Sequence, residues 1–191
     1  SAFGSLNTGS MVFIKKLTAS SSATLSFVDG ASSVVLDDTY KEYIFTFKDI
    51  HPATDSATLL FNMSVDGGSN YNVTKTTAVF QSAHDEADTT TNLSYRTDID
   101  NAQQTGFQSI AKEIGNGNDE NASGYLHLFN PSSTTFVKHF LSNFNIYFKA
   151  DYSLEHFTAG YGNTTSAINA VQFKMDSGNI DAGDICLYGI L

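Results

Sequence analysis

A short acidic run beside a histidine is the densest group of potentially catalytic side chains in the chain. The run "HDEAD", from His84 to Asp88, places three carboxylates next to an imidazole. Paired carboxylates hydrolyse glycosides when one protonates the leaving oxygen and the other acts as base or nucleophile. Local spacing does not identify such a pair, and acidic loops are common in an acidic chain. We therefore expect a solvated loop here and no catalytic residue; an enzyme would use Asp85 or Glu86.

A second polar run has the residue types of a cation site. "DIDN", from Asp98 to Asn101, alternates oxygen ligands but lacks the glycine and the distal glutamate of an EF-hand calcium loop. Metal-ligand spacing is also missing among the five histidines, which are His51, His84, His127, His139 and His156. The lone cysteine, Cys186, lies in an apolar run and is expected to be a small buried hydrophobic residue. The sequence predicts no metal site and no cofactor.

Charge and hydropathy limit the partners of the chain. Its 191 residues have a formal net charge of -10, and Arg96 is the only arginine, so a surface that follows nucleic-acid phosphates is not expected. No window has the roughly 18 consecutive apolar residues of a membrane helix. The first residues, "SAFGSLNTGS", lack the basic and apolar parts of a secretory signal. We expect neither a membrane segment nor export through a signal peptide.

The elements that position these residues are expected to be strands. Aromatic residues make up 13% of the chain and charged residues only 16%, a mixture that favours strands over helices. In "YIFTFKDI", Tyr43, Phe45 and Phe47 share one face, and Pro52 follows as a strand terminator. In "LLFNMSVD", from Leu59 to Asp66, the alternation predicts one face in the core and the other, with Asn62 and Ser64, in water. Further strands are expected at 11–17, 23–28, 72–80, 92–97, 106–114, 124–129, 136–148, 154–160, 167–175 and 184–190.

Turn residues indicate how these strands connect. "DGG" at 66–68 supplies the positive-φ residues of a tight turn and predicts a hairpin between the strands at 59–66 and 72–80. Gly178 and Gly183 are expected as chain-reversal points on either side of "NIDA". Both faces of the strand at 184–190 carry apolar residues, which predicts an inner strand rather than an edge.

Roughly ten short strands without a convincing helix predict one all-β domain, an antiparallel, jelly-roll-like β-sandwich over 11–191. Residues 1–10 are small and polar and read as a flexible arm that a partner would order; Phe3 and Leu6 are its apolar anchors. The stretch from Gln81 to Ser123 is polar and rich in loops. Tyr95, Arg96 and Phe107 within it are the expected binding residues of the surface.

Two long stretches resemble a family of small virion-structural and fibre-associated domains of tailed bacteriophages. They are "YKEYIFTFKDIHPATDSATLLFNMSVDGGSNY" at 40–71 and "AINAVQFKMDSGNIDAGDICLYGIL" at 167–191. The shared features are a tyrosine-rich strand, an "HPA" corner, a "DGG" turn and a terminal glycine-spaced "LYG" strand. The resemblance extends over nearly the whole chain after the arm. Its motifs are turns and core strands, so they indicate a fold family and no active site.

The resemblance implies a non-enzymatic protein on the virion surface, made in the cytoplasm of the host bacterium. Because only about ten residues precede the expected domain, it favours a capsid decoration protein or short head fibre anchored through the arm. The alternatives are a tail-fibre domain that binds a host glycan or protein through the loops at 81–123 and, more remotely, a polysaccharide depolymerase. Expected partners are other virion proteins and further copies in a closed oligomer such as a trimer, with Leu60 and Phe129 contributing.

Overall fold

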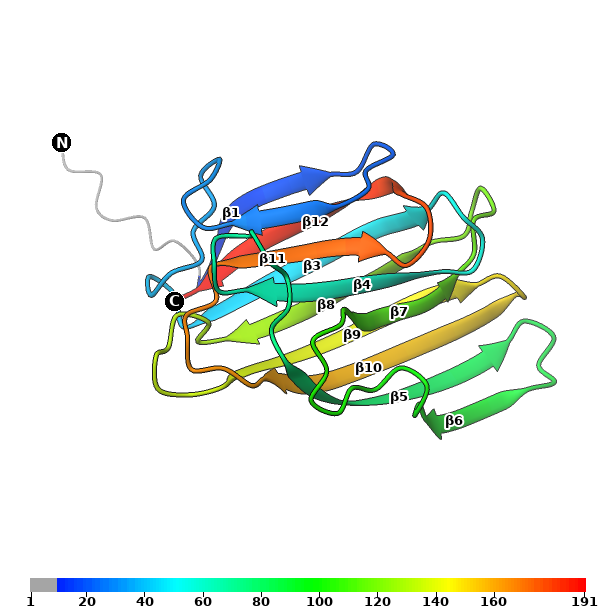
Figure 1. Cartoon of the computed structure of the whole chain (residues 1–191). Helices are drawn as coiled ribbons and strands as arrows, with labels where there is room; N and C mark the ends of the chain where they lie inside the picture. The colour runs from blue at the N-terminus through cyan, green and yellow to red at the C-terminus, as the bar shows by residue number, and fades with distance from the viewer. Residues whose placement is uncertain (1–9) are drawn as a thin grey trace.

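The computed structural model describes residues 10–191, and these form twelve β-strands without a helix (Figure 1). The arm residues Phe3 and Leu6 lie outside the described residues. All strand pairs are antiparallel. The strands are β1 (Met11–Thr18), β2 (Leu25–Val28), β3 (Glu42–Pro52), β4 (Ala57–Ser64), β5 (Lys75–Asp85), β6 (Thr91–Tyr95), β7 (Gln108–Ile114), β8 (Ala122–Phe129), β9 (Lys138–Phe148), β10 (Tyr152–Gly162), β11 (Ala170–Met175) and β12 (Ile180–Ile190).

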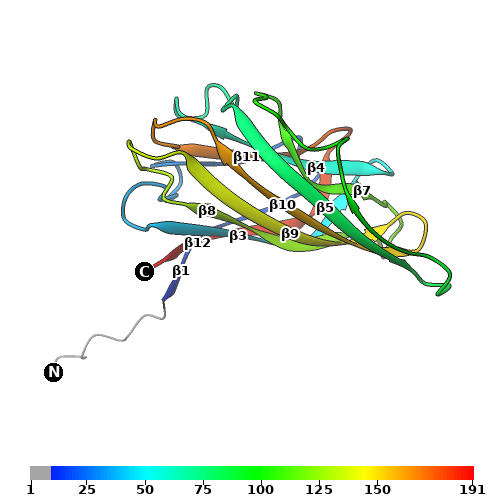
Figure 2. The same ribbon diagram turned by 90° about the horizontal axis from the view of Figure 1, so that it is seen from below.

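The strands form two layers. The large sheet has the order β1-β12-β3-β8-β9-β10-β5-β6, and the small sheet has the order β7-β4-β11-β2. Figure 2 shows β11 and β4 in one layer and β12 and β3 in the other. The two sheets are joined where Ile114 of β7 pairs with Phe148 of β9. The predicted antiparallel β-sandwich is thereby confirmed.

Eight of the strands have the connectivity of a jelly roll. One half of the sandwich is β1-β12-β3-β8 and the other is β2-β11-β4-β7. Along the chain these strands alternate between the two halves, except that β4 and β7 are neighbours in the same sheet. This is the double-sheet arrangement of a jelly roll. The remaining strands are two insertions, β5–β6 after β4 and β9–β10 after β8, and they extend the large sheet beyond β8.

Aromatic side chains fill the space between the sheets. Tyr43, Phe45 and Phe47 of β3 are all buried, as their alternation predicts. At the centre, the ring of Phe173 packs edge-on against Phe45 and Phe47, with centroid distances of 5.3 and 4.9 Å. Such edge-to-face pairs add to the free energy gained from burying the rings. Because β3 and β11 lie in different sheets, these contacts hold the two layers together.

The structure corrects the expected environment of β4. Its Asn62 and Ser64, predicted in water, are completely buried, while Val65, predicted in the core, is 38% exposed. Chain segments cover the second face of β4: Asn62 Nδ2 donates hydrogen bonds to the carbonyls of Tyr71 and Thr105. A polar residue on a strand tolerates burial when such partners satisfy it.

The predicted hairpin between β4 and β5 is wrong. Gly67 and Gly68 do adopt positive φ angles of 71° and 84°. However, β4 pairs with β7 and β11, and β5 pairs with β6 and β10. The "DGG" turn therefore redirects the chain from the small sheet to the large one, and the following residues pass over β4 before β5 begins.

The end of the chain is an inner strand, as expected, because β12 lies between β1 and β3. Gly178, with φ at 66°, lies in the turn before it. Gly183 is not a chain-reversal point, because it lies within β12 where the register with β3 shifts. Its φ of 117° and the backbone of Asp49 close by explain why glycine occupies this bulge.

A buried polar layer lies under the inserted strands. Lys75 is completely buried, and its Nζ donates to Asn62 Oδ1 at 2.6 Å and to the carbonyl of Val73 at 2.8 Å. Burial lowers the pKa of Lys75 to about 8. Farther along the paired strands, His156 of β10 is also fully buried, with Nε2 2.7 Å from Gln81 Oε1. The large sheet is thus more polar beneath its inserted strands than beneath its jelly-roll strands.

Candidate functional site

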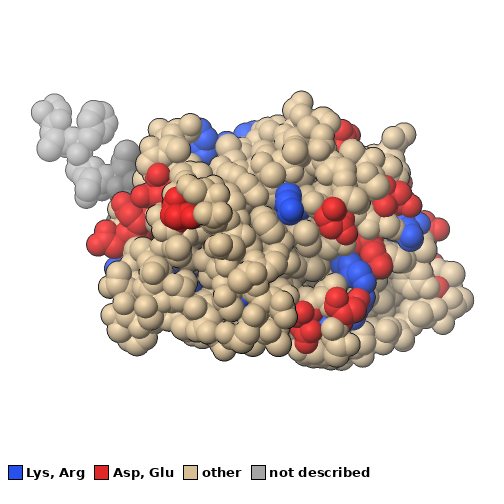
Figure 3. Space-filling view, in the orientation of Figure 1, with Lys and Arg blue, Asp and Glu red and all other residues tan. Residues whose placement is uncertain are grey.

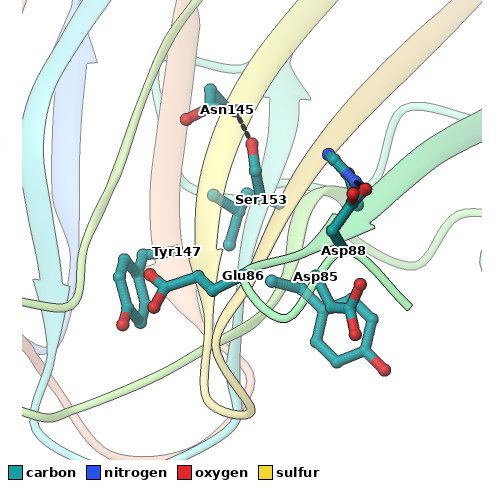
Figure 4. A pocket seen from close by; sticks show the side chains of 9 residues that line it. Asp85, Glu86, Asp88, Asn145, Tyr147 and Ser153 are labelled. Carbon is teal, nitrogen blue, oxygen red and sulfur yellow. Dashed lines mark hydrogen bonds and ion pairs between the residues drawn. The ribbon is translucent and has the colours of Figure 1, made fainter. Parts of the chain in front are cut away.

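The "HDEAD" run lines a hollow at one end of the inserted strands. The run lies at the end of β5 and in the turn to β6. Strand β10 pairs with both β5 and β9, so residues of β9 and β10 form the opposite side of the hollow. The hollow has a volume of about 360 Å³ and is open to solvent. Figure 4 shows side chains of the acidic run and of the β9–β10 hairpin, which are far apart in the sequence, around the same hollow. The lining residues are His84, Asp85, Glu86, Asp88, Asn145, Ile146, Tyr147, Tyr152 and Ser153.

Asp85 has a structural role in this hollow. Its carboxylate accepts hydrogen bonds from the backbone amides of Thr89 and Thr90, at 2.9 and 2.8 Å, and from the Thr89 hydroxyl. These bonds close the turn between β5 and β6. They stabilise the ionised form, so the pKa of Asp85 is lowered, first by the Thr89 hydroxyl. A general acid for glycoside cleavage needs a raised pKa, so Asp85 is poorly suited to that role.

Tyr147 and Glu86 both line the hollow. Figure 4 shows the Glu86 carboxylate extended toward Tyr147. The Tyr147 hydroxyl donates to Asp151 Oδ1 at 3.2 Å. Its pKa is raised to about 12, mainly by burial, with the Asp151 hydrogen bond and the charge of Glu86 adding to the effect. The phenol is therefore a hydrogen-bonding group that stays protonated across the physiological range.

The rim of the hollow consists of groups that donate or accept hydrogen bonds. His84 Nε2 is 3.1 Å from Asp88 Oδ1, and Asn145 Nδ2 donates to Ser153 Oγ at 2.9 Å. With Tyr147 and Tyr152, the hollow combines aromatic rings, carboxylates and an amide. This set suits a hydroxyl-rich ligand, because rings contact the C–H faces of a sugar and carboxylates accept from its hydroxyls.

A second, apolar groove lies on the outer face of the large sheet, the face that points away from the small sheet. The groove has a volume of about 420 Å³ and is lined mainly by β8, β9, β10 and β5. Phe80 and Phe157 stack along it with ring centroids 4.7 Å apart. Leu141 and Phe80 are 48% and 45% exposed. The strand pairings place Tyr125, Asn143, Phe157 and Phe80 in one cross-strand row.

The predicted binding residues of the loops do not form one site. Tyr95 ends β6, is about half exposed and donates from its hydroxyl to Asp100 Oδ2 at 2.8 Å. Arg96 follows it, with its guanidinium held by Asp98 and Gln81. Phe107 lies beside the small sheet instead, where Lys174 Nζ is 4.4 Å from its ring centroid.

The "DIDN" run is occupied by internal contacts. Asp98 accepts from Arg96 Nη2 at 2.9 Å and from Lys112 Nζ at 2.6 Å, and Asp100 accepts from Tyr95. The hydrogen bonds from Arg96 and then Lys112 lower the pKa of Asp98. In residues 10–191, no group of three or more His, Cys, Asp or Glu side chains is arranged to hold a metal ion. Cys186, expected to be buried, is partly exposed on β12.

The "HDEAD" run is visible in the sequence, but the residues that lie beside it in the hollow are not. Asn145 and Tyr147 come from β9, about 60 positions along the chain from the acidic run, and the antiparallel register brings them beside it. Their signal is the alternation in "NFNIYF", where polar or amphipathic residues occupy every second position of a strand. That pattern indicates an exposed face without saying what lies opposite.

Comparisons of the chain with models of protein families, with curated proteins and with solved structures gave no significant match. The resemblance to virion domains of tailed phages therefore stays a prediction. Within the described part of the chain, the structure contains no helix with the length and apolar character needed to cross a membrane. On the face seen in Figure 3, acidic side chains gather at the left edge and over the right half, where basic side chains lie among them.

Proposed function

We propose that this chain is a non-enzymatic structural domain of a tailed-phage virion, held on the particle through the apolar groove of the large sheet. This function is the one that the sequence resemblance implies. The jelly-roll architecture of the chain is also found in viral capsid proteins. The observation that carries it is the groove itself, where Phe80, Tyr125 and Leu141 are each more than 40% exposed on the strands that line it.

Such a surface is unusual on a chain that otherwise carries a large negative charge. Contiguous apolar patches on soluble domains mark contact surfaces, because water around them is released when a partner covers them. The partner we infer is an apolar surface of a neighbouring virion protein. A strand face rather than a loop makes the contact, so the geometry of attachment is fixed by the sheet.

The test uses particles of a phage that encodes the chain. Quantitative mass spectrometry gives its copy number relative to the major capsid protein. We expect hundreds of copies for a decoration protein, and a Leu141→Asp variant supplied in place of the natural chain should fold but fail to join the particle. Val65→Asp is the matched control, because Val65 is also exposed but lies outside the groove. Absence of the chain from particles, or equal incorporation of both variants, contradicts the proposal.

A second candidate function is supported by the hollow at the "HDEAD" run, which combines Tyr147 and Tyr152 with Asn145 and Glu86. In this alternative the chain is a receptor-binding domain, and the hollow holds a carbohydrate of the host surface. Calorimetry with polysaccharide extracted from the host measures this directly. Binding that Tyr152→Ala weakens at least about tenfold, with Tyr161→Ala as the control, supports it. No heat of binding, or equal effects of the two variants, rejects it.

A further inference from the structure

The strand β6 leaves an open edge on the large sheet. An edge strand exposes unpaired backbone groups, and proteins commonly protect such edges with charges, prolines, bulges or covering segments. At the opposite edge, β1 contains Lys15 and Lys16 and a register shift after Phe13. By contrast, β6 reads "TNLSY", with no charge, no proline and a regular register against β5. Four of its five residues are exposed.

The hydrogen bonds to β5 show which backbone groups of β6 point to the open edge. The amide of Arg96 donates to the carbonyl of Val79 at 2.9 Å, and the amide of Asp85 donates to the carbonyl of Thr90 at 3.2 Å. Hydrogen-bonded and non-hydrogen-bonded pairs alternate along an antiparallel ladder, so the backbone N–H and C=O groups of every second residue of β6 point to β5. The residues between them, Thr91, Leu93 and Tyr95, direct their N–H and C=O groups away from the sheet.

From this arrangement we propose that β6 of one copy pairs antiparallel with β6 of a second copy, about a twofold axis at Leu93. Only residues with outward-facing groups can form the hydrogen-bonded pairs of the new ladder. Leu93 then lies opposite Leu93, and Thr91 lies opposite Tyr95. Each copy has three such residues, so the two copies together have six amide donors and six carbonyl acceptors. All of them are paired in this register. The two large sheets become one continuous sheet.

The side chains fit the same register. Thr91, Leu93 and Tyr95 share the outer face with Phe80, whose cross-strand partner is Tyr95. Leu93 is 73% exposed in the single chain and would contact its own copy, while each Tyr95 ring would contact a threonine. A twofold contact places the same surface of both copies face to face, so that surface must be complementary to itself. This strand meets the condition, because leucine lies opposite leucine at its centre and threonine lies opposite tyrosine on either side.

Charge and size set the expected strength. Each copy has a formal net charge of -10, so the copies repel one another at low salt. The contact is one short strand per copy, well below the area of a stable interface. We therefore expect a weak, concentration-dependent dimer that strengthens when the ionic strength rises from about 0.05 to about 0.5 M. The inference does not depend on the proposed virion role, since it concerns the isolated chain.

Sedimentation equilibrium of the purified chain tests the proposal. Leu93→Lys should raise the dimer dissociation constant at least about tenfold. Leu141→Lys is the matched control, because Leu141 is also an exposed leucine of the outer face but lies on an inner strand, and it should leave the constant unchanged. A monomer at all concentrations overturns the proposal. So does a dimer that Leu141→Lys weakens and Leu93→Lys does not, which would place the contact at the apolar groove.

Cysteine cross-linking tests the register. In a Cys186→Ser background, Leu93→Cys should form a disulfide-linked dimer under mild oxidation, because paired Cα atoms lie about 5.5 Å apart, within disulfide range. Asn92→Cys is the control on the same strand, because position 92 would face Ser94 of the other copy. Thr91→Cys mixed with Tyr95→Cys should give the mixed dimer. Equal cross-linking at positions 92 and 93 contradicts the proposed register.

Discussion

Protonation of His156 should control the stability of the fold at mildly acidic pH. The imidazole is completely buried, with Nε2 against Gln81 Oε1, and its Nδ1 has no hydrogen-bond partner among the described residues. Burial lowers the pKa of His156 from 6.5 to about 4, and the positive charges of Arg96 and Lys112 act in the same direction. Folding therefore requires the neutral ring at every pH above about 4.

The magnitude follows from the two pKa values. The unfolded chain takes up a proton at His156 below pH 6.5, whereas the folded chain does so only near pH 4. Between these values the unfolded state binds more protons, so the free energy of unfolding falls as the pH falls. At about 1.4 kcal/mol per pH unit, the loss is about 2 kcal/mol at pH 5 and about 3 kcal/mol once the pH is below 4.

Urea unfolding at a series of pH values between 7 and 5 measures this loss. His156→Gln retains an amide that can donate to Gln81 but cannot titrate, so its free energy of unfolding should change little over the interval. His84→Gln is the control, because His84 is exposed at the rim of the acidic hollow, and it should keep the dependence of the natural chain. If the natural chain and His156→Gln lose the same free energy between pH 7 and 5, the reasoning about the buried ring is refuted.

Four further substitutions probe the core, the backbone and an ion pair, and urea unfolding at pH 7 measures each. Phe173→Ala removes the ring that joins the two sheets and should cost about 3 to 5 kcal/mol, and a cost below about 1 kcal/mol would contradict its central position. Gly183→Ala places a Cβ 2.6 Å from the Asp49 carbonyl and should cost about 2 kcal/mol or more, whereas Gly67→Ala, with free space, should cost about 1 kcal/mol. Asp98→Asn should cost about 1 kcal/mol, because its carboxylate is half exposed, and the cost should shrink at high salt.

Strands with one buried face were predictable from the sequence. In β3, alternating aromatic residues indicated the inner face correctly, and Pro52 marked the end of the strand. The same pattern located β11, where Val171, Phe173 and Met175 are buried. The reason is local, because alternate side chains of a strand point to opposite faces whatever its neighbours are. Strand positions and the sandwich architecture followed from this rule.

Pairing partners were not predictable in the same way. Gly67 and Gly68 have the positive φ angles of a tight turn, yet β4 and β5 lie in different sheets. A turn signal fixes the local backbone, whereas the choice of partner depends on contacts across the whole chain. The burial of Asn62 was unpredictable for a similar reason. Its amide donates to the carbonyls of Tyr71 and Thr105, which approach it only in the folded chain, and without these partners a strand amide is expected to face water.

The acidic hollow shows the same division between local and distant information. "HDEAD" was visible as a cluster, but the sequence could not show that Asp85 closes a turn or that Glu86 lies near Tyr147. Roles of acidic residues depend on their hydrogen bonds, and those bonds come from the folded backbone. The same limit applies to Phe107, which was grouped with Tyr95 as a loop residue although the two lie beside different sheets.

All three surface features with functional potential lie on the inserted strands. The acidic hollow is formed by β5, β9, β10 and the turn after β5; the apolar groove is lined mostly by the same strands; and the open edge is β6. Without the insertions, β8 would be the edge of the large sheet and none of these surfaces would exist. The jelly roll supplies most of the folded core, including Phe45, Phe61 and Phe173, and the inserted strand β9 adds Phe140 and Phe144 to it. Differences in function between proteins with this core should therefore depend on the strands inserted after β4 and β8.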